Sequence, residues 1–109
     1  MAHIVVVEAR KAQARLVETM LSSHHHEVTV FKTAREGLQM VRDGAMVELV
    51  LVSATLPDSN GIEFAARLRQ DASHYGTPLL MIAEDVTHRM RGLEIIDDFI
   101  EVYLGFVLP

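Results

Sequence analysis

The sequence predicts a single α/β domain with a doubly wound, five-stranded parallel sheet. Short β-branched apolar runs alternate along the chain with longer segments in which apolar residues recur at helical spacing. Because these runs are apolar at consecutive positions, both faces of each strand are expected to be buried, as in parallel sheets covered by crossover helices. Right-handed crossovers then place helices on both faces of the sheet. The 109 residues, half of them apolar, fit one domain with one core.

The first strand and the first helix are expected at residues 3–7 and 11–21. The strand is a continuous apolar run, and the segment after it has one apolar helical face. Residues 27–31 then form the second strand. The helical side chains expected to face the core are Ala12, Leu16, Val17 and Met20.

The second helix is expected at residues 34–42. Thr33 and Glu36 form a capping box, in which each side chain can satisfy a backbone donor of the other residue at the helix start. The pair Asp43-Gly44 is a stop signal, and residues 48–52 form the third strand. The side chains of this helix expected to face the core are Ala34, Leu38 and Val41.

The second half of the chain continues the alternation. Residues 62–70 are expected to be helical, residues 79–83 form a fourth strand after Pro78, and residues 85–93 form a fourth helix. The fifth strand is expected at residues 99–104. The helical side chains expected to face the core are Ile62, Ala65 and Leu68, then Val86, Met90 and Leu93.

Composition excludes several classes of function. Lys and Arg total 10 against 15 Asp and Glu, and the net charge of −5 argues against broad nucleic-acid binding, which needs a basic face. Because there is no cysteine, disulfides and thiolate metal sites are excluded. The first apolar run is too short for a signal peptide or a membrane span, so we expect a cytoplasmic protein.

A functional site is expected beyond the carboxyl ends of the strands, where the strand order of such a sheet reverses. The first strand is followed by Glu8 and Ala9, and the third strand ends at Ser53. The fourth strand ends at Ala83, and the fifth strand carries Val102.

Five segments together resemble the receiver domain of bacterial two-component response regulators. They are V-V-V-E, E-V-T-V-F-K-T-A-R-E-G-L, L-V-L-V-S-A-T-L-P-D-S-N-G, T-P-L-L-M-I-A and D-D-F-I. Their order and spacing are the specific signal, and the most telling piece is Leu56-Pro57 with Gly61. The resemblance runs from Ile4 to about Leu104, and it implies a flavodoxin-like, receiver-type fold with strand order 2-1-3-4-5.

The resemblance also implies a phosphorylation site, from which this sequence departs. Ser53 stands where receivers have the phosphoryl-accepting aspartate. Glu8 and Ala9 occupy the positions of the acidic pair that binds magnesium. Ala83 replaces the hydroxyl residue at the end of the fourth strand, and Val102 occupies the position of the lysine.

These departures predict a degenerate receiver, or pseudo-receiver. Phosphoryl transfer depends on cations that neutralise the developing charge, and no lysine occurs after Lys32. Glu8 alone is a poor site for magnesium, and Ser53 is a weak nucleophile without a base. Without a hydroxyl at Ala83, nothing would draw in the aromatic side chain at Phe99. We therefore expect no catalytic residues, no cofactor, no magnesium binding and no enzyme activity.

Simpler interpretations of the same residues are available. A serine at a strand end is more often a local hydrogen-bonder of the turn than a modification site, and this interpretation is favoured for Ser53. Glu8 is interpreted as a solvated acid in the first turn of the next helix. The triplet His24-His25-His26 invites a metal interpretation, but its side chains would point in different directions and no second ligand cluster is visible.

The C-terminal sequence is unusual for the suggested family. Receivers usually continue into a last amphipathic helix, which is apparently missing here. The apolar tail is a candidate interaction surface, formed by Tyr103, Leu104, Phe106 and Leu108. Residues 1–109 are expected to form one receiver-like domain, the N-terminal module of a longer protein, unless an oligomer buries the tail.

Three functions remain open at this point. The favoured one is a phosphorylation-independent interaction module in bacterial signalling, with a protein partner, an attached output domain or a second copy as its partner. An atypical receiver could still be switched by modification of Ser53, or by a ligand in a pocket lined by Glu8, Thr55 and Glu84. A flavodoxin-like small-ligand binder is the weakest, because no glycine-rich turn follows the first strand.

Overall fold

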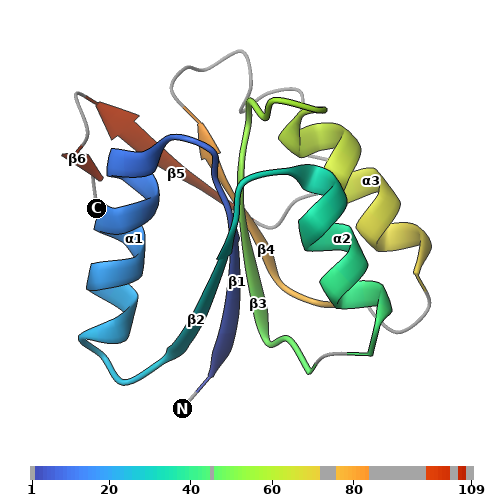
Figure 1. Cartoon of the computed structure of the whole chain (residues 1–109), viewed down its shortest axis with the longest axis horizontal. Helices are drawn as coiled ribbons and strands as arrows, with labels where there is room; N and C mark the ends of the chain where they lie inside the picture. Colours follow the sequence, from blue (N-terminus) through green and yellow to red (C-terminus); the bar gives the residue numbers. More distant parts are fainter. Residues whose placement is uncertain (1, 45, 72–75, 84–97, 104–105, 108–109) are drawn as a thin grey trace.

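The computed structural model describes residues 2–44, 46–71, 76–83, 98–103 and 106–107, of which Ala83 and the last two ranges are described for the backbone alone. The strands of this part form one sheet in the order β2-β1-β3-β4-β5-β6 (Figure 1). In chain order the elements are β1 His3–Val7, α1 Lys11–Ser22, β2 Glu27–Phe31, α2 Ala34–Arg42, β3 Leu49–Ser53, α3 Gly61–Gln70, β4 Leu79–Ala83, β5 Asp98–Tyr103 and β6 Phe106–Val107.

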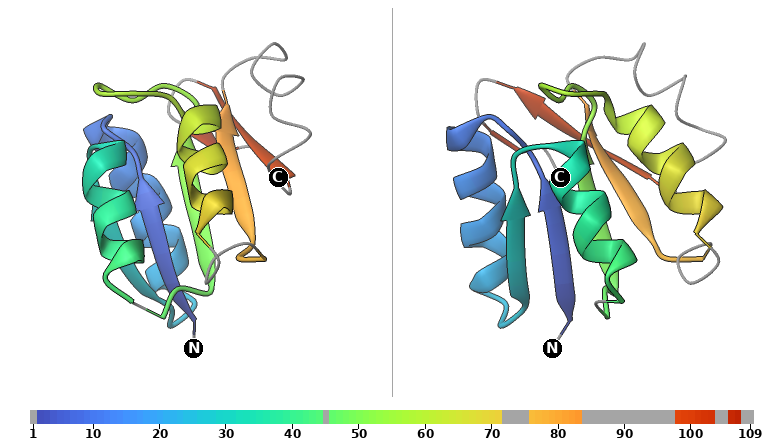
Figure 2. Two further views of the ribbon diagram at one scale, coloured as in Figure 1. Left: turned by 90° about the vertical axis from the view of Figure 1, so that its right-hand side faces the viewer. Right: turned by 45° about the vertical axis from the view of Figure 1, so that its right-hand side comes forward.

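The sheet confirms the predicted doubly wound, flavodoxin-like topology. Strands β1 to β5 are all parallel, and β1 lies between β2 and β3. Ile4 of β1 is in register with Val28 of β2 on one side and Leu49 of β3 on the other. Helix α1 covers one face of the sheet, whereas α2 and α3 cover the opposite face (Figures 1 and 2).

Two apolar clusters fill the spaces between the sheet and its helices. Because side chains alternate along a strand, Val5 and Val7 of β1 belong to the cluster under α2 and α3, while Ile4 and Val6 belong to the cluster under α1. All four side chains are at most 2% exposed. The central strands are therefore buried on both faces, as their uninterrupted apolar sequences predict.

Side chains cap the N-termini of α2 and α3. Thr33 Oγ1 accepts a hydrogen bond from the Glu36 backbone N–H at 3.1 Å, as the capping box predicts. The reciprocal contact differs, because the Thr33 hydroxyl donates to the Glu36 carboxylate at 2.9 Å. For α3, Asn60 Oδ1 accepts from the Glu63 backbone N–H at 2.8 Å. This cap starts the helix at Gly61, one residue before the predicted start.

The prediction for the buried face of α1 was partly wrong. Ala12 and Met20 are exposed, Met20 to 46%. The buried side chains of this helix are Ala14 and Val17, and Leu21 continues their line at i+4 from Val17. Apolar spacing alone permits both stripes, and the position of the helix on β1 and β2 selects the second.

In α3 the main buried side chain was missed. Phe64 is fully buried and belongs to the same cluster as Ala65 and Leu68, which were predicted to face the core. Ile62, also predicted to face the core, is half-buried. Gly37 of α2 packs so closely here that a Cβ atom on it would lie 3.2 Å from the Phe64 ring.

The chain reverses direction after β5. β5 begins one residue earlier than predicted, and β6, which was not predicted, pairs with it in antiparallel orientation, with Val102 opposite Val107 and Tyr103 opposite Phe106. β6 lies beside α1 (Figure 1). The helix predicted at residues 85–93 lies outside the described residues. No helix in the described part of the chain is long and apolar enough to cross a membrane.

Candidate functional site

Glu8 lies at the carboxyl end of β1 and is almost completely buried, with 1% of its surface exposed. Its backbone N–H donates to the Phe31 carbonyl at 2.9 Å, which holds the residue at the end of the sheet. The interpretation of Glu8 as a solvated acid in the first helical turn was wrong. α1 begins only at Lys11, and its first turn contains no acidic residue.

Arg10 occupies both oxygens of the Glu8 carboxylate. Glu8 Oε1 accepts from Arg10 Nη2 at 3.0 Å and from Nε at 3.3 Å, and Glu8 Oε2 accepts from the Arg10 backbone N–H at 3.0 Å. The Arg10 side chain is 39% exposed, whereas that of Glu8 is not exposed. A buried carboxylate is strongly unfavourable unless it is paired and hydrogen-bonded. The bend between β1 and α1 supplies both kinds of contact from a single residue.

Ser53 ends β3 and is completely buried. Its Oγ accepts a long hydrogen bond, of 3.4 Å, from the Thr55 backbone N–H. This contact is of the local kind expected for a serine at a strand end. The hydroxyl therefore has no exposed surface from which to meet a reagent in solution.

Gly61 closes the chain tightly over the end of β3. A Cβ atom at Gly61 would lie 2.5 Å from the Ser53 carbonyl oxygen, closer than side chains approach backbone, so glycine is required by this contact. The Gly61 N–H also donates to the Ala54 carbonyl at 3.0 Å, and the Ala54 N–H donates to the Ile82 carbonyl at 2.9 Å. The segment around Ser53 is consequently fixed to both α3 and β4.

Asp58 connects the loop after β3 to the N-terminus of α2. Its two carboxylate oxygens accept from the backbone N–H groups of Ala34 at 2.9 Å and Arg35 at 3.0 Å. The hydrogen bond from Ala34 is the main reason why the pKa of Asp58 lies below its usual value, and desolvation opposes the shift. The partners are 24 and 23 residues away in sequence, so no local motif could have revealed this contact.

The structure places the remaining predicted positions as follows. Ala9 follows Glu8 directly and offers no side-chain ligand. Ala83 ends β4 in register with Glu101, Phe99 lies opposite Met81, and Val102 lies in β5. The backbones of Tyr103 and Phe106 pair with each other in the chain reversal. Of the other predicted residues, Thr55 is exposed, and those outside the described residues are Glu84, Leu104 and Leu108.

The described residues at this edge of the sheet do not fit magnesium. Magnesium prefers octahedral coordination by oxygen, with one or two carboxylates and several waters. Glu8 is the carboxylate at the end of β1, and Arg10 holds both of its oxygens. Ala9 lacks an oxygen ligand, and the Ser53 hydroxyl is buried.

The histidine triplet does not form a metal centre. His24 and His25 are exposed, while His26 Nδ1 accepts from the Ala2 backbone N–H at 3.2 Å. His25 has φ of 65°, the left-handed conformation common after the end of a helix. No group of three or more His, Cys, Asp or Glu residues among those described is arranged to bind a metal ion.

Fold and site together define a receiver-type α/β domain in which the described strand ends carry a buried Glu8–Arg10 ion pair and a buried Ser53. The family model of the response regulator receiver domain matches residues 4–101. The chain belongs to this family. Among curated proteins it is similar to the uncharacterized transcriptional regulatory protein YkoG of Bacillus subtilis, with 31% identity over 93 residues, covering 85% of this chain and 40% of YkoG.

Solved structures show the same fold. The chemotaxis response regulator CheY4 of Vibrio cholerae has a TM-score of 0.86 and 20% identity, covering 93% of this chain and 86% of that one. The HemR receiver domain of Leptospira biflexa has a TM-score of 0.79 and 25% identity, covering 93% and 82%. The chain spans less than half the length of the curated relatives it matches, 40% and 45% for the first two.

Proposed function

We propose that this receiver domain is degenerate and acts as a phosphorylation-independent interaction module in bacterial signal transduction. One observation supports this most strongly: the carboxylate at the metal-binding position, Glu8, is buried and bound on both oxygens by Arg10. The Arg10 guanidinium then supplies the positive charge that a divalent cation supplies in an active receiver. Within the described residues the Glu8 carboxylate is thus already neutralised by Arg10, which supports a domain that works without a metal ion.

The position of Ser53 supports the same proposal. A phosphoryl acceptor must be reached by the phosphodonor and needs cations to stabilise the transferring group. Ser53 has no exposed surface, and its backbone is held between α3 and β4. The burial of Ser53 also argues against the alternative in which modification of this hydroxyl switches the domain.

The partner of such a module would be a protein. We propose a cytoplasmic role in which the domain holds an attached output domain or a separate signalling protein, or pairs with a second copy. The curated relatives are more than twice as long as this chain, and YkoG is described as a transcriptional regulatory protein. These relatives favour an attached output domain, and no catalytic activity is proposed for the receiver itself.

A phosphodonor experiment tests the proposal directly. The chain is incubated with acetyl phosphate and magnesium, and its intact mass is measured over time beside a receiver known to accept phosphate from this donor. We expect no phosphoryl adduct on the chain while the control receiver is modified. A stable adduct, located on Ser53 or on a carboxylate at the strand ends such as Glu8, would contradict the proposal.

A further inference from the structure

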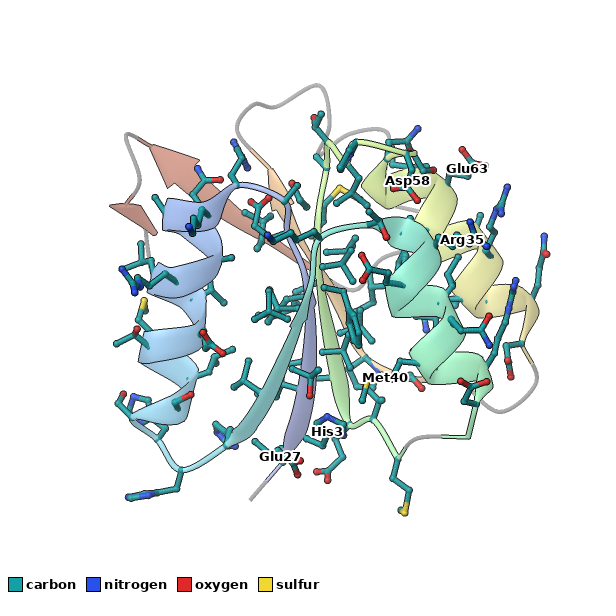
Figure 3. All side chains as sticks on the ribbon, viewed as in Figure 1. His3, Glu27, Arg35, Met40, Asp58 and Glu63 are labelled. Carbon is teal, nitrogen blue, oxygen red and sulfur yellow. The ribbon has the colours of Figure 1, made fainter. Side chains whose placement is uncertain are left out.

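A narrow groove of about 360 Å³ separates α2 from α3 on the outer surface of the domain. Figure 3 shows three of its lining side chains, Arg35, Asp58 and Glu63, at the ends of these helices. The buried side chains of Leu38 and Phe64 contribute to its lining. The groove lies between two helices that cover one face of the sheet, and neither Glu8 nor Arg10 is part of its lining.

The groove is lined by an excess of positive charge. Arg35, Arg42 and Arg67 oppose Asp58 and Glu63. Both carboxylates are already engaged: Asp58 accepts from two backbone N–H groups of α2, and Glu63 accepts from Arg67 at 2.8 Å and from a serine hydroxyl at 3.0 Å.

Two of the arginines are less closely held, although the positive charge of Arg35 contributes to the lowered pKa of Asp58. The guanidinium groups of Arg35 and Arg42 make no hydrogen bond or ion pair with any residue that the structure describes, and both side chains are exposed. This is notable in a chain whose net charge is −5, because its acidic side chains outnumber its basic ones and would be expected to pair with most arginines. The groove therefore presents two exposed guanidinium groups, and their donors are not used by any hydrogen bond or close ion pair with the described residues.

The spacing of the two arginines defines the shape of a ligand. Residues 35 and 42 are seven apart in α2, so their side chains lie on the same face, about 10 Å apart along the helix axis. Gln39, between them, adds an amide to the same lining. Two carboxylates at this spacing occur seven residues apart in a helix, or three apart in an extended chain.

We propose that the groove between α2 and α3 docks an acidic segment of a partner protein, with two carboxylates of that segment paired to Arg35 and Arg42. The guanidinium group suits carboxylates because it can donate two parallel hydrogen bonds. An acidic peptide fits better than a nucleic acid, since Asp58 and Glu63 interrupt the positive surface that a continuous phosphate backbone would need. The inference rests on the proposed function as an interaction module and names the surface used.

The test is a titration of the whole chain with two synthetic helical peptides, followed by the NMR shifts of its backbone amides. The probe peptide consists of alanine and glutamine with glutamates at two positions seven residues apart, and the control peptide has glutamine at both. We expect shifts confined to α2, α3 and the loop between β3 and α3, with the probe only, and weaker binding as salt is added.

Matched variants then assign the charge contacts. Replacing both groove arginines, R35Q together with R42Q, is expected to weaken the probe peptide roughly fivefold to tenfold. The control, K11Q together with R15Q, removes the same charge from exposed positions of α1 and is expected to change affinity less than about twofold. Thermal unfolding of both variants verifies that the fold is intact.

Several outcomes would overturn the inference. These are equal loss of binding in the two double variants, shifts centred outside α2 and α3, equal binding of the control peptide, and tighter binding of a single-stranded oligonucleotide at the same arginines. The phosphodonor experiment remains independent. A chain that takes no phosphoryl group and binds no acidic peptide contradicts the groove alone, whereas a phosphorylated chain contradicts the proposed function alone.

Discussion

Two carboxylate–guanidinium pairs of the described residues lie in opposite settings, one at the end of β1 and one on the outer face of α3. Glu8 and Arg10 meet at 3.0 Å, with the Glu8 side chain fully buried. Glu63 and Arg67 meet at 2.8 Å, with side chains 47% and 54% exposed. The distances are nearly equal, so burial is what separates the two pairs.

Burial decides what each pair can do. A buried pair cannot separate without leaving an uncompensated charge, so the β1 end is a fixed structural element. An exposed pair exchanges readily with water and other ions and contributes little to stability. We therefore expect the Glu8–Arg10 pair to stabilise the strand ends, which is the edge where an active receiver does its chemistry. The exposed outer face of the helices stays available for binding.

The largest effect is expected from separating the buried pair. Arg10→Ala leaves the Glu8 carboxylate without its guanidinium, and we expect a loss of about 2 kcal/mol in the free energy of unfolding. The value lies below that of a fully buried pair because Arg10 is 39% exposed. Urea unfolding at neutral pH measures it.

The control for this prediction removes the stranded charge. In the double variant Glu8→Gln with Arg10→Ala, the neutral amide carries no charge penalty, and at least half of the lost stability should return. An Arg10→Ala variant as stable as the unmodified chain would show that water or another group already satisfies Glu8. Burial would then not make the Glu8–Arg10 pair more important for stability than the Glu63–Arg67 pair.

The sequence predicted most of the fold because the determining signals are local. Continuous apolar runs specified β1, β3 and β4, and the Thr33–Glu36 pattern marked the start of α2. The buried face of α1 was misassigned because the spacing of apolar residues does not fix how the helix is rotated about its own axis, and an error of one or two positions remains possible. Packing against the sheet determines which face is buried.

The site was harder to predict because no recognisable sequence motif specifies its contacts. The Glu8–Arg10 pair depends on a backbone bend that folds residue 10 back over residue 8. A helix would point the two side chains in different directions, and a strand would hold them on one face about 6.6 Å apart. Asp58 reaches the N-terminus of α2 from 24 residues away. The departures from the receiver pattern at Ser53 and Ala9 were predicted from the resemblance, whereas the contacts of Glu8 with Arg10 were not.

Asp58 provides an intermediate case, an exposed carboxylate with fixed partners. Asp58→Ala removes two hydrogen bonds from the N-terminus of α2, and we expect a loss of about 1 kcal/mol at pH 7. Because folding lowers the pKa of Asp58, its contribution is complete above the unfolded value, near 3.8, and is lost as pH falls through the folded value. Unfolding measured from pH 7 down to pH 3 should show the two proteins converging.

A matched control uses the other end of the same helix. Asp43 is the C-cap residue of α2, and its carboxylate accepts from the Gln39 side chain at 2.8 Å rather than from a backbone N–H group. Asp43→Ala should change stability by less than about 0.5 kcal/mol, because surface substitutions of this kind rarely do more. If Asp43→Ala and Asp58→Ala had equal effects, the special role of Asp58 as a bridge to α2 would be refuted.

The smallest effect is expected from the exposed pair on α3. Arg67→Gln breaks the contact with Glu63, and an exposed pair four residues apart in a helix is worth about 0.3–0.5 kcal/mol. A double-mutant cycle with Glu63→Gln isolates this coupling from the rest of the helix. A coupling near 2 kcal/mol, as large as that at Glu8, would mean that the outer face is as rigid as the strand ends. In that case the groove beside Arg67 would be a rigid contact between α2 and α3. The exposure of Arg35 and Arg42 would then need an explanation other than a ligand.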